Sequence, residues 1–174
     1  MSFAHITIGK NAPELINVVV EIPRGSRNKY EYNEELDVIT LDRVLHSPFF
    51  FPTDYGFVPH TRSEDGDHLD ILVLITQPAF PGCVIQVRPI GVLDLEDEAG
   101  RDWKIIAVAD KDPYYKTINN IDDVNIHLKR EIKHFFETYK QLEDNKMTKV
   151  RGWESKEKAY AVIKEAQERY KDNK

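Results

Sequence analysis

The chain has 174 residues, with 30 Asp and Glu against 24 Lys and Arg, a formal net charge of -6 and a single Cys. This acidic balance disfavours nucleic acid as a partner, and Cys83 cannot form an internal disulfide. No apolar run of about 18 residues and no basic start followed by an apolar stretch occurs, so we expect neither a membrane span nor a signal peptide but a cytoplasmic protein. We expect residues 1–174 to form one domain.

Alternation of apolar and polar residues predicts a β-rich front two-thirds. The predicted strands, in chain order, are Leu15–Ile22, Lys29–Tyr32, Leu36–Leu45, Leu69–Ile75, Val84–Leu95 and Trp103–Val108. The second and third form a hairpin around residues 33–35, and alternation in its second arm puts Ile39, Leu41 and Arg43 on one face.

The tail of the chain changes to a helical period. Asp122 is the predicted cap of a helix whose apolar positions run from Val124 to Leu142 at steps of three or four residues. A second helix is predicted after Ser155. Strands followed by two helices predict an α+β fold, an antiparallel barrel or strongly bent sheet with the helices packed on its outside.

The segment from Glu64 to Asp70 is the first candidate site. Asp65, Asp67 and Asp70 lie close together around Gly66, which lets the backbone bend. Such crowded carboxylates are costly unless a cation neutralises them, and oxygen ligands favour Mg²⁺, Mn²⁺ or Ca²⁺. A calcium EF-hand is excluded because position 12, counted from Asp65, is Thr76 instead of Glu.

A second acidic window is predicted to be a hairpin tip at residues 97–102. Alternation puts Asp102, Lys104 and Ile106 on one face of the outgoing strand, where a carboxylate and a lysine could hold a metal and an anion together. Glu98 is assigned to solvent. The simpler interpretation is a surface hairpin with a salt bridge.

Basic and phenolic side chains complete the pattern. Lys29, Arg43, Lys104 and the pair Tyr139-Lys140 together resemble a phosphate cradle, because Arg offers a planar fork and Lys a point charge to phosphoryl oxygens. Carboxylates for hard metals together with cations for phosphate indicate metal-assisted phosphoryl chemistry.

From about Glu14 to Trp153 the chain resembles the soluble family I inorganic pyrophosphatases of the prokaryotic type. The resemblance rests on an ordered set of motifs: Glu21-Ile22-Pro23, Lys29-Tyr30-Glu31, Asp42-Arg43, Pro52 with Tyr55-Gly56, Asp65-Gly66-Asp67 with Asp70, Asp97-Glu98 with Asp102 and Lys104, His134-Phe135-Phe136-Glu137 with Tyr139-Lys140, and Lys149-Val150 with Gly152-Trp153. It implies a five-stranded OB-like closed β-barrel flanked by two C-terminal helices.

The resemblance also implies Mg²⁺-dependent hydrolysis of pyrophosphate to two phosphates. It implies activating-metal ligands at Asp65, Asp70 and Asp102, further metal ligands at Asp97 and Glu31, a general base at Asp67, phosphate ligands at Lys29, Arg43, Tyr55, Lys104, Tyr139 and Lys140, and a cavity-lining carboxyl at Glu21. Prokaryotic members usually form hexamers, so we expect a homo-oligomer.

Two residues depart from the family pattern. His68 replaces the usual Pro, which removes a rigid φ from the aspartate segment, and we expect its imidazole to face solvent or pack on the loop. Phe51 stands where the family often places a Tyr near the substrate.

Two other functions remain open at this point. An OB-like barrel with aromatics near Phe49–Phe57 could stack single-stranded bases, although the charge of -6 argues against it. A metal-dependent hydrolase of nucleotides or phosphomonoesters is the other alternative.

Overall fold

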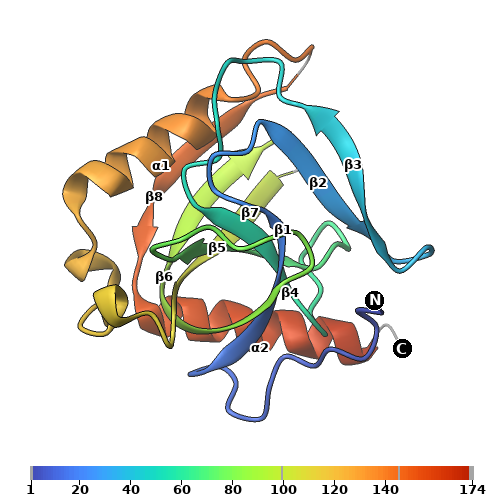
Figure 1. Ribbon diagram of the computed structural model, residues 1–174, viewed down its shortest axis with the longest axis vertical. Helices are drawn as coiled ribbons and strands as arrows, with labels where there is room; N and C mark the ends of the chain where they lie inside the picture. The colour runs from blue at the N-terminus through green and yellow to red at the C-terminus, as the bar shows by residue number, and fades with distance from the viewer. Residues whose placement is uncertain (1, 99, 145, 173–174) are drawn as a thin grey trace.

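The computed structural model describes residues 2–98, 100–144 and 146–172 (Figure 1). Its elements, in chain order, are β1 (Ile16–Ile22), β2 (Asn28–Asn33), β3 (Val38–Val44), β4 (Asp54–Val58), β5 (Leu69–Leu74), β6 (Val84–Asp97), β7 (Gly100–Ala109), the 3-10 turns η1 (Pro113–Tyr115) and η2 (Ile121–Asp123), α1 (Ile126–Thr138), β8 (Thr148–Glu154) and α2 (Lys156–Asp172). Every predicted strand is therefore confirmed, within a few residues at its ends. No described helix is long and apolar enough to cross a membrane.

Five strands close into a barrel. They pair in the order β1-β4-β5-β7-β6, and β6 pairs back with β1, while β8 extends the sheet from β6. The predicted five-stranded closed barrel with two C-terminal helices is confirmed. One pairing differs from the antiparallel expectation: β5 and β7 are parallel, because β7, and not β6, lies beside β5.

The barrel strands bury side chains on both faces, and each helix covers one of them (Figure 1). Leu72 packs in the same buried cluster as Phe136 of α1, whereas its neighbours in β5, Ile71 and Val73, pack in the cluster that contains Val162 of α2. Burying one such aliphatic side chain contributes about 1.5–3 kcal/mol. This double burial explains why β5 reads as a continuous apolar run.

The start and the end of α1 differ from the prediction. Residues Ile121–Asp123 form their own 3-10 turn, and Val124 is extended, so the helix cannot begin at Asp122. Asn125 is the cap instead, and its side-chain oxygen accepts a hydrogen bond of 2.8 Å from the His127 backbone N–H. The helix ends at Thr138, which leaves Leu142 outside it and 64% exposed.

Strands β4 and β8 were missing from the sequence prediction. β4 is buried throughout and lies between β1 and β5. Gly56 permits this close approach, because a β-carbon at that position would overlap the Val19 carbonyl oxygen of β1.

Strands β2 and β3 form a separate two-stranded hairpin beside the barrel (Figure 1). Lys29 pairs with Arg43, but Tyr30 pairs with Leu41, so Asp42 is the extra residue of a β-bulge. The bulge places Arg43 opposite Lys29. The prediction that Arg43 shares a face with Ile39 and Leu41 is therefore wrong, because alternation breaks at the bulge.

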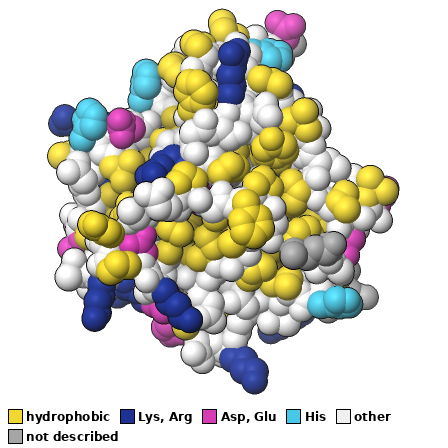
Figure 2. Space-filling model, viewed as in Figure 1, with side chains coloured by type: hydrophobic (Ala, Val, Ile, Leu, Met, Phe, Trp, Pro, Cys, Tyr) yellow, Lys and Arg dark blue, Asp and Glu magenta, His cyan; other side chains and the backbone are white. Residues whose placement is uncertain are grey.

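Hydrophobic side chains gather across the middle of the face seen in Figure 2. Among the described residues, several large hydrophobic side chains are exposed, including Phe80 at 63% and Tyr114 at 79%. Val84 and Tyr114 line an open, mainly apolar groove. Such surfaces are more common at contacts between proteins than on isolated monomers.

Candidate active site

A single cavity of about 530 Å³ brings together every site residue expected from the sequence. Its lining includes Glu21, Lys29, Glu31, Arg43, Tyr55, Asp65, Asp67, Asp70, Asp97, Asp102, Lys104, Tyr139 and Lys140. These residues come from the barrel, the β2–β3 hairpin, the segment before β5, the tip of the β6–β7 hairpin and the end of α1. Ala99, at that tip, lies outside the described residues.

The aspartate segment turns tightly before β5. The Asp67 backbone N–H donates a 3.0 Å hydrogen bond to the Asp65 side chain, and Gly66 adopts a φ of +94°, a value that favours glycine. Ser63 closes the turn, since its backbone N–H donates to the Asp67 carbonyl oxygen at 2.7 Å. Burial, followed by the charges of Asp65 and Asp70, raises the pKa of Asp67.

The parallel register of β5 and β7 sets the next contact. Ile71 is paired with Ile105, so the residues just before them, Asp70 and Lys104, lie next to each other. The Lys104 ammonium nitrogen lies 2.6 Å from Asp70 and 2.8 Å from Asp102. Burial lowers the pKa of Lys104, but the charges of Asp102 and Asp70 outweigh it and hold the pKa well above its usual range.

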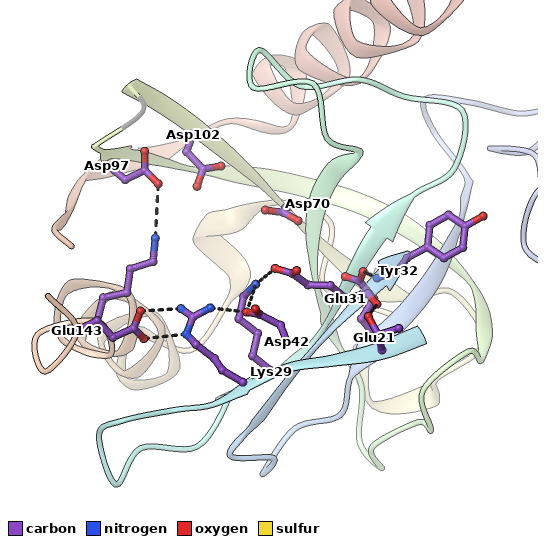
Figure 3. Close-up of polar contacts among 12 residues, drawn as sticks. Glu21, Lys29, Glu31, Tyr32, Asp42, Asp70, Asp97, Asp102 and Glu143 are labelled. Carbon is purple, nitrogen blue, oxygen red and sulfur yellow. Dashed lines mark hydrogen bonds and ion pairs between the residues drawn. The ribbon is translucent and has the colours of Figure 1, made fainter. Parts of the chain in front are cut away.

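The hairpin supplies the opposite wall (Figure 3). Lys29 pairs with Glu31 and, at 3.3 Å, with Asp42. Arg43 contacts Asp42 and also contacts the carboxylate of Glu143 through two nitrogens at 3.0 Å each. Arg43 thus presents the fork geometry that suits a carboxylate or a phosphate.

Lys140 completes a pattern of paired charges. Its ammonium nitrogen lies 3.6 Å from Asp97, and a dashed line marks this ion pair at Asp97 in Figure 3. Each of the four basic side chains expected to bind phosphate therefore contacts at least one carboxylate of the same cavity. Anionic substrate and carboxylates would compete for these cations.

Glu21 lies at the back of the cavity. Burial, and then the negative charge of Asp70, raises its pKa to about 8, which keeps the carboxyl protonated near neutral pH. One of its oxygens accepts a 2.7 Å hydrogen bond from the Tyr32 backbone N–H, which ties β2 to β1. Burial also raises the pKa of Tyr55 and of Tyr139, so both phenols keep their protons as hydrogen-bond donors.

The charge balance of the cavity fits divalent metal ions. The described lining contains nine carboxyl groups against five Lys and Arg side chains. Burial is the main cause that raises the pKa of Asp102 as well as that of Asp67, and the negative charge of Asp70 adds to both shifts. Among the described residues no three Asp, Glu, His or Cys side chains already converge on one point, because Asp70 and Asp102 are turned toward Lys104. Oxygen ligands of this kind suit Mg²⁺, Mn²⁺ or Ca²⁺.

The sequence profile of the inorganic pyrophosphatase family matches residues 18–171. The chain belongs to that family. It is 53% identical to the inorganic pyrophosphatase of Methanosarcina mazei over 157 residues, which cover 90% of this chain and 92% of the relative.

Crystal structures of inorganic pyrophosphatases agree with this fold. The structure from Thermus thermophilus superposes with a TM-score of 0.95 at 47% identity and covers 98% of this chain and 99% of its own. A structure from Helicobacter pylori gives a TM-score of 0.92 at 43% identity, with 96% and 99% covered. Pyrophosphatases from these sources thus share both the fold and about half of the sequence.

The cavity lining also contains residues that the sequence analysis does not place in the site: Tyr30, Tyr32, Phe57, His68, Glu98, Glu143 and Lys146. Glu98 was expected in solvent, but it lines the cavity and pairs with Lys146. Because Glu98 directly follows Asp97 in the chain, its sequence position could have indicated that it lines the cavity. Glu143 and Lys146 lie in an irregular segment after α1, where no periodicity indicates direction.

The two departures from the family pattern have different surroundings. His68 lines the cavity with a side chain that is only 13% exposed, so the imidazole packs instead of facing solvent. The Phe51 ring is buried against Phe135, with ring centroids 4.9 Å apart.

Proposed function

We propose that the chain hydrolyses inorganic pyrophosphate to two orthophosphates, with Mg²⁺ as the activating metal and metal-activated water as the nucleophile. The observation that carries this proposal is the cavity in which carboxylates alternate with Lys and Arg side chains, found in a chain of the inorganic pyrophosphatase family. Its high density of charged side chains suits a compact polyanion better than a stacked base.

The proposed ligands of the activating metals are Asp65, Asp70 and Asp102. Asp97 and Glu31 are proposed to hold metals that arrive with the substrate. A divalent ion bound by these groups lowers the pKa of a coordinated water and offsets the charge of phosphoryl oxygens. The chain's own part is to present carboxylates that can exchange an ammonium partner for a metal ion, as the pairing of Asp70 with Lys104 permits.

The proposed substrate ligands are Lys29, Arg43, Lys104, Lys140, Tyr55 and Tyr139. Lys29 and Arg43 come from the β2–β3 hairpin, Lys104 from β7 and Lys140 from the segment after α1, so together they can hold both phosphoryl groups of a diphosphate. The neutral phenols of Tyr55 and Tyr139 donate hydrogen bonds without adding charge. Glu21, protonated near neutral pH, lines the cavity without repelling the substrate.

Asp67 is the proposed general base. Its carboxylate lies in the turn beside the proposed ligand Asp65, and it lines the cavity. In that position it can take a proton from a water that attacks phosphorus.

The test is phosphate release from pyrophosphate, ATP and p-nitrophenyl phosphate, each with Mg²⁺, with Mn²⁺ and with EDTA. We expect rapid release from pyrophosphate with Mg²⁺, little from ATP or p-nitrophenyl phosphate and none with EDTA. Faster release from ATP or p-nitrophenyl phosphate would favour a hydrolase of nucleotides or phosphomonoesters. Salt-sensitive binding of a labelled oligonucleotide without phosphate release would favour the single-strand binding module.

We further propose that residues 1–174 form one pyrophosphatase domain that assembles as a cytoplasmic homohexamer and binds neither nucleic acid nor membrane. The exposed side chains of Phe80 and Tyr114 support self-association, and the net charge of -6 disfavours anionic polymers. Size-exclusion chromatography with light scattering tests the assembly. A mass near 20.2 kDa at every concentration would reject it.

A further inference from the structure

His68 lies between the proposed base Asp67 and the proposed ligand Asp70, but its side chain turns toward the β2–β3 hairpin. Its Nε2 atom lies 3.0 Å from a carboxylate oxygen of Glu34, and its Nδ1 atom lies 3.0 Å from the Thr61 carbonyl oxygen. The ring therefore contacts the hairpin with one nitrogen and its own loop with the other.

Glu34 belongs to the turn between β2 and β3 and has a second, stronger partner. Both of its oxygens accept hydrogen bonds from the Arg62 guanidinium, one of them at 2.7 Å. Arg62 is itself fixed to α2, because its backbone N–H donates a 2.8 Å hydrogen bond to the Ala166 carbonyl oxygen. The tip of the hairpin is thus held against the body of the molecule.

Aromatic packing adds a second link between the same elements. The His68 ring stacks on Phe57 of β4 at a centroid distance of 4.8 Å, and Phe57 stacks on Tyr32 of β2 at 4.9 Å. The planes of His68 and Phe57 differ by only 18°. Such stacked ring pairs stabilise a contact beyond the apolar area that they bury.

The hairpin needs such links because it shares no strand pairing with the barrel. It nevertheless contributes Lys29, Glu31 and Arg43 to the cavity. The position of these side chains relative to the aspartate turn therefore depends on side-chain contacts, and a two-stranded hairpin is only marginally stable by itself.

We propose that His68 and Glu34 are positioning residues for substrate binding. Their contact fixes the hairpin, and with it Lys29 and Glu31, relative to the turn that carries Asp65, Asp67 and Asp70. This inference rests on the proposed function. In this chain the imidazole also takes over, by side-chain contacts, part of the restraint that a proline would give the turn.

The test compares His68→Ala, Glu34→Ala, Glu34→Gln and the double variant His68→Ala/Glu34→Ala. Glu35→Ala is the matched control, since Glu35 is the next residue of the same turn and is exposed. KM and kcat for pyrophosphate are measured at saturating Mg²⁺. The affinity for methylenediphosphonate with Mg²⁺, measured by calorimetry, reports binding without turnover.

We expect each alanine variant to raise both KM and the Kd of the analogue about three- to tenfold, which is the range for losing a half-exposed charged hydrogen bond. The kcat of each variant should stay within about twofold of the parent value. Glu34→Gln, which keeps an acceptor, should lose less than Glu34→Ala. The effect of the double variant should be smaller than the product of the two single effects, because both single variants lose the same contact between His68 and Glu34. It can exceed either single effect, since Glu34→Ala also loses the Arg62 contact and His68→Ala also loses the stacking on Phe57. Glu35→Ala should match the parent.

The positioning role would be overturned if Glu34→Ala and Glu35→Ala had the same KM. It would also be overturned if the effect of the double variant on KM were the product of the two single effects. A third contradicting result would be equal losses of kcat and stability in a variant whose KM is unchanged. If His68→Ala does not fold, the two Glu34 variants decide by the same criteria. A parent enzyme that does not hydrolyse pyrophosphate would reject the proposed function, whereas an active parent insensitive to Glu34→Ala rejects only this inference.

Discussion

The ammonium nitrogen of Lys104 lies 2.6 Å from a carboxylate oxygen of Asp70 at the point where two parallel strands enter the cavity. Lys104 is nearly fully buried, with 6% of its side chain exposed. A buried ammonium requires a negative partner, and a carboxylate next to it is already oriented toward positive charge. The same pair can therefore serve two ligands, one cationic and one anionic.

Asp70→Asn removes one negative charge from this pair and should raise the Mg²⁺ concentration needed for half-maximal activity by about tenfold or more. Turnover should fall as well. Asp122→Asn is the control, because that side chain is 95% exposed and distant from the cavity lining. Mg²⁺ titrations of initial rate measure the effect. Identical titration curves for the two variants would reject Asp70 as a metal ligand.

Arg43→Ala removes a cation that the β2–β3 hairpin contributes to the cavity, and Lys140→Ala removes one that the segment after α1 contributes. Charge-assisted contacts to phosphate are worth roughly 1.5–3 kcal/mol, so we expect binding or turnover to weaken by about tenfold or more. Lys171→Ala, on the exposed last turn of α2, should leave both unchanged. If Lys140→Ala behaves like the parent at every substrate concentration, the segment after α1 does not bind pyrophosphate.

Asp67→Asn keeps the size of the side chain but cannot accept a proton. It should cut kcat by about 10²–10⁴ while leaving the affinities for Mg²⁺ and methylenediphosphonate nearly intact. The remaining activity should increase toward alkaline pH, where metal-bound water ionises without a base. A loss explained wholly by weaker metal binding would make Asp67 a ligand instead.

The stability of the metal-free protein should depend on Glu21. Its pKa is about 8 in the folded chain against an ordinary value of 4.5, so the folded state binds the proton more tightly. This contribution to stability is fully present below about pH 4.5 and is lost as pH rises through about 8, with a slope of up to about 1.4 kcal/mol per pH unit. Urea unfolding in EDTA between pH 5 and 8 should show the parent losing stability relative to Glu21→Gln. Parallel curves would contradict the raised pKa.

Gly56→Ala tests the close approach of β4 to β1. The added methyl group would overlap the Val19 carbonyl oxygen, so the barrel must open locally, and we expect a loss of about 3 kcal/mol or more, or failure to fold. Gly152→Ala is the matched control in β8, where an added β-carbon meets nothing within 4 Å. Thermal unfolding of the two variants gives the comparison, and equal midpoints would show that the contact between β1 and β4 is loose.

The sequence predicted the fold well where apolar residues form long runs or recur at a helical period. Strands β1, β5, β6 and β7 follow from their apolar patterns, and α2 follows from its buried positions Ala159 to Ala166. β4 escaped prediction because its five residues include Asp54 and Gly56, both weak strand formers, and so contain no long apolar run. The parallel pairing of β5 with β7 depends on which strand lies beside which, a long-range property that no local pattern encodes.

Most residues of the cavity could also be predicted. The carboxylates near Gly66 and the Lys and Arg side chains occur in the same order along the chain as in the pyrophosphatase family. The directions in which these side chains point could be predicted less well. The bulge at Asp42 reversed the expected face of Arg43, and the contact of Glu98 with Lys146 joins two irregular segments. Such contacts depend on tertiary packing rather than on spacing along the chain.

The independence of the β2–β3 hairpin also has a consequence for local unfolding. Strand pairing joins β2 and β3 only to each other, and the Tyr32 N–H adds one hydrogen bond to the Glu21 side chain of β1. The hairpin's side chains are half-buried or exposed, whereas β5 is paired on both sides and almost wholly buried. Regions with few buried apolar contacts open at lower free energy than a closed core. Amide protons of residues 28–44 should therefore exchange with deuterium through local openings of the hairpin. During these openings the barrel, which forms the other wall of the cavity, stays closed.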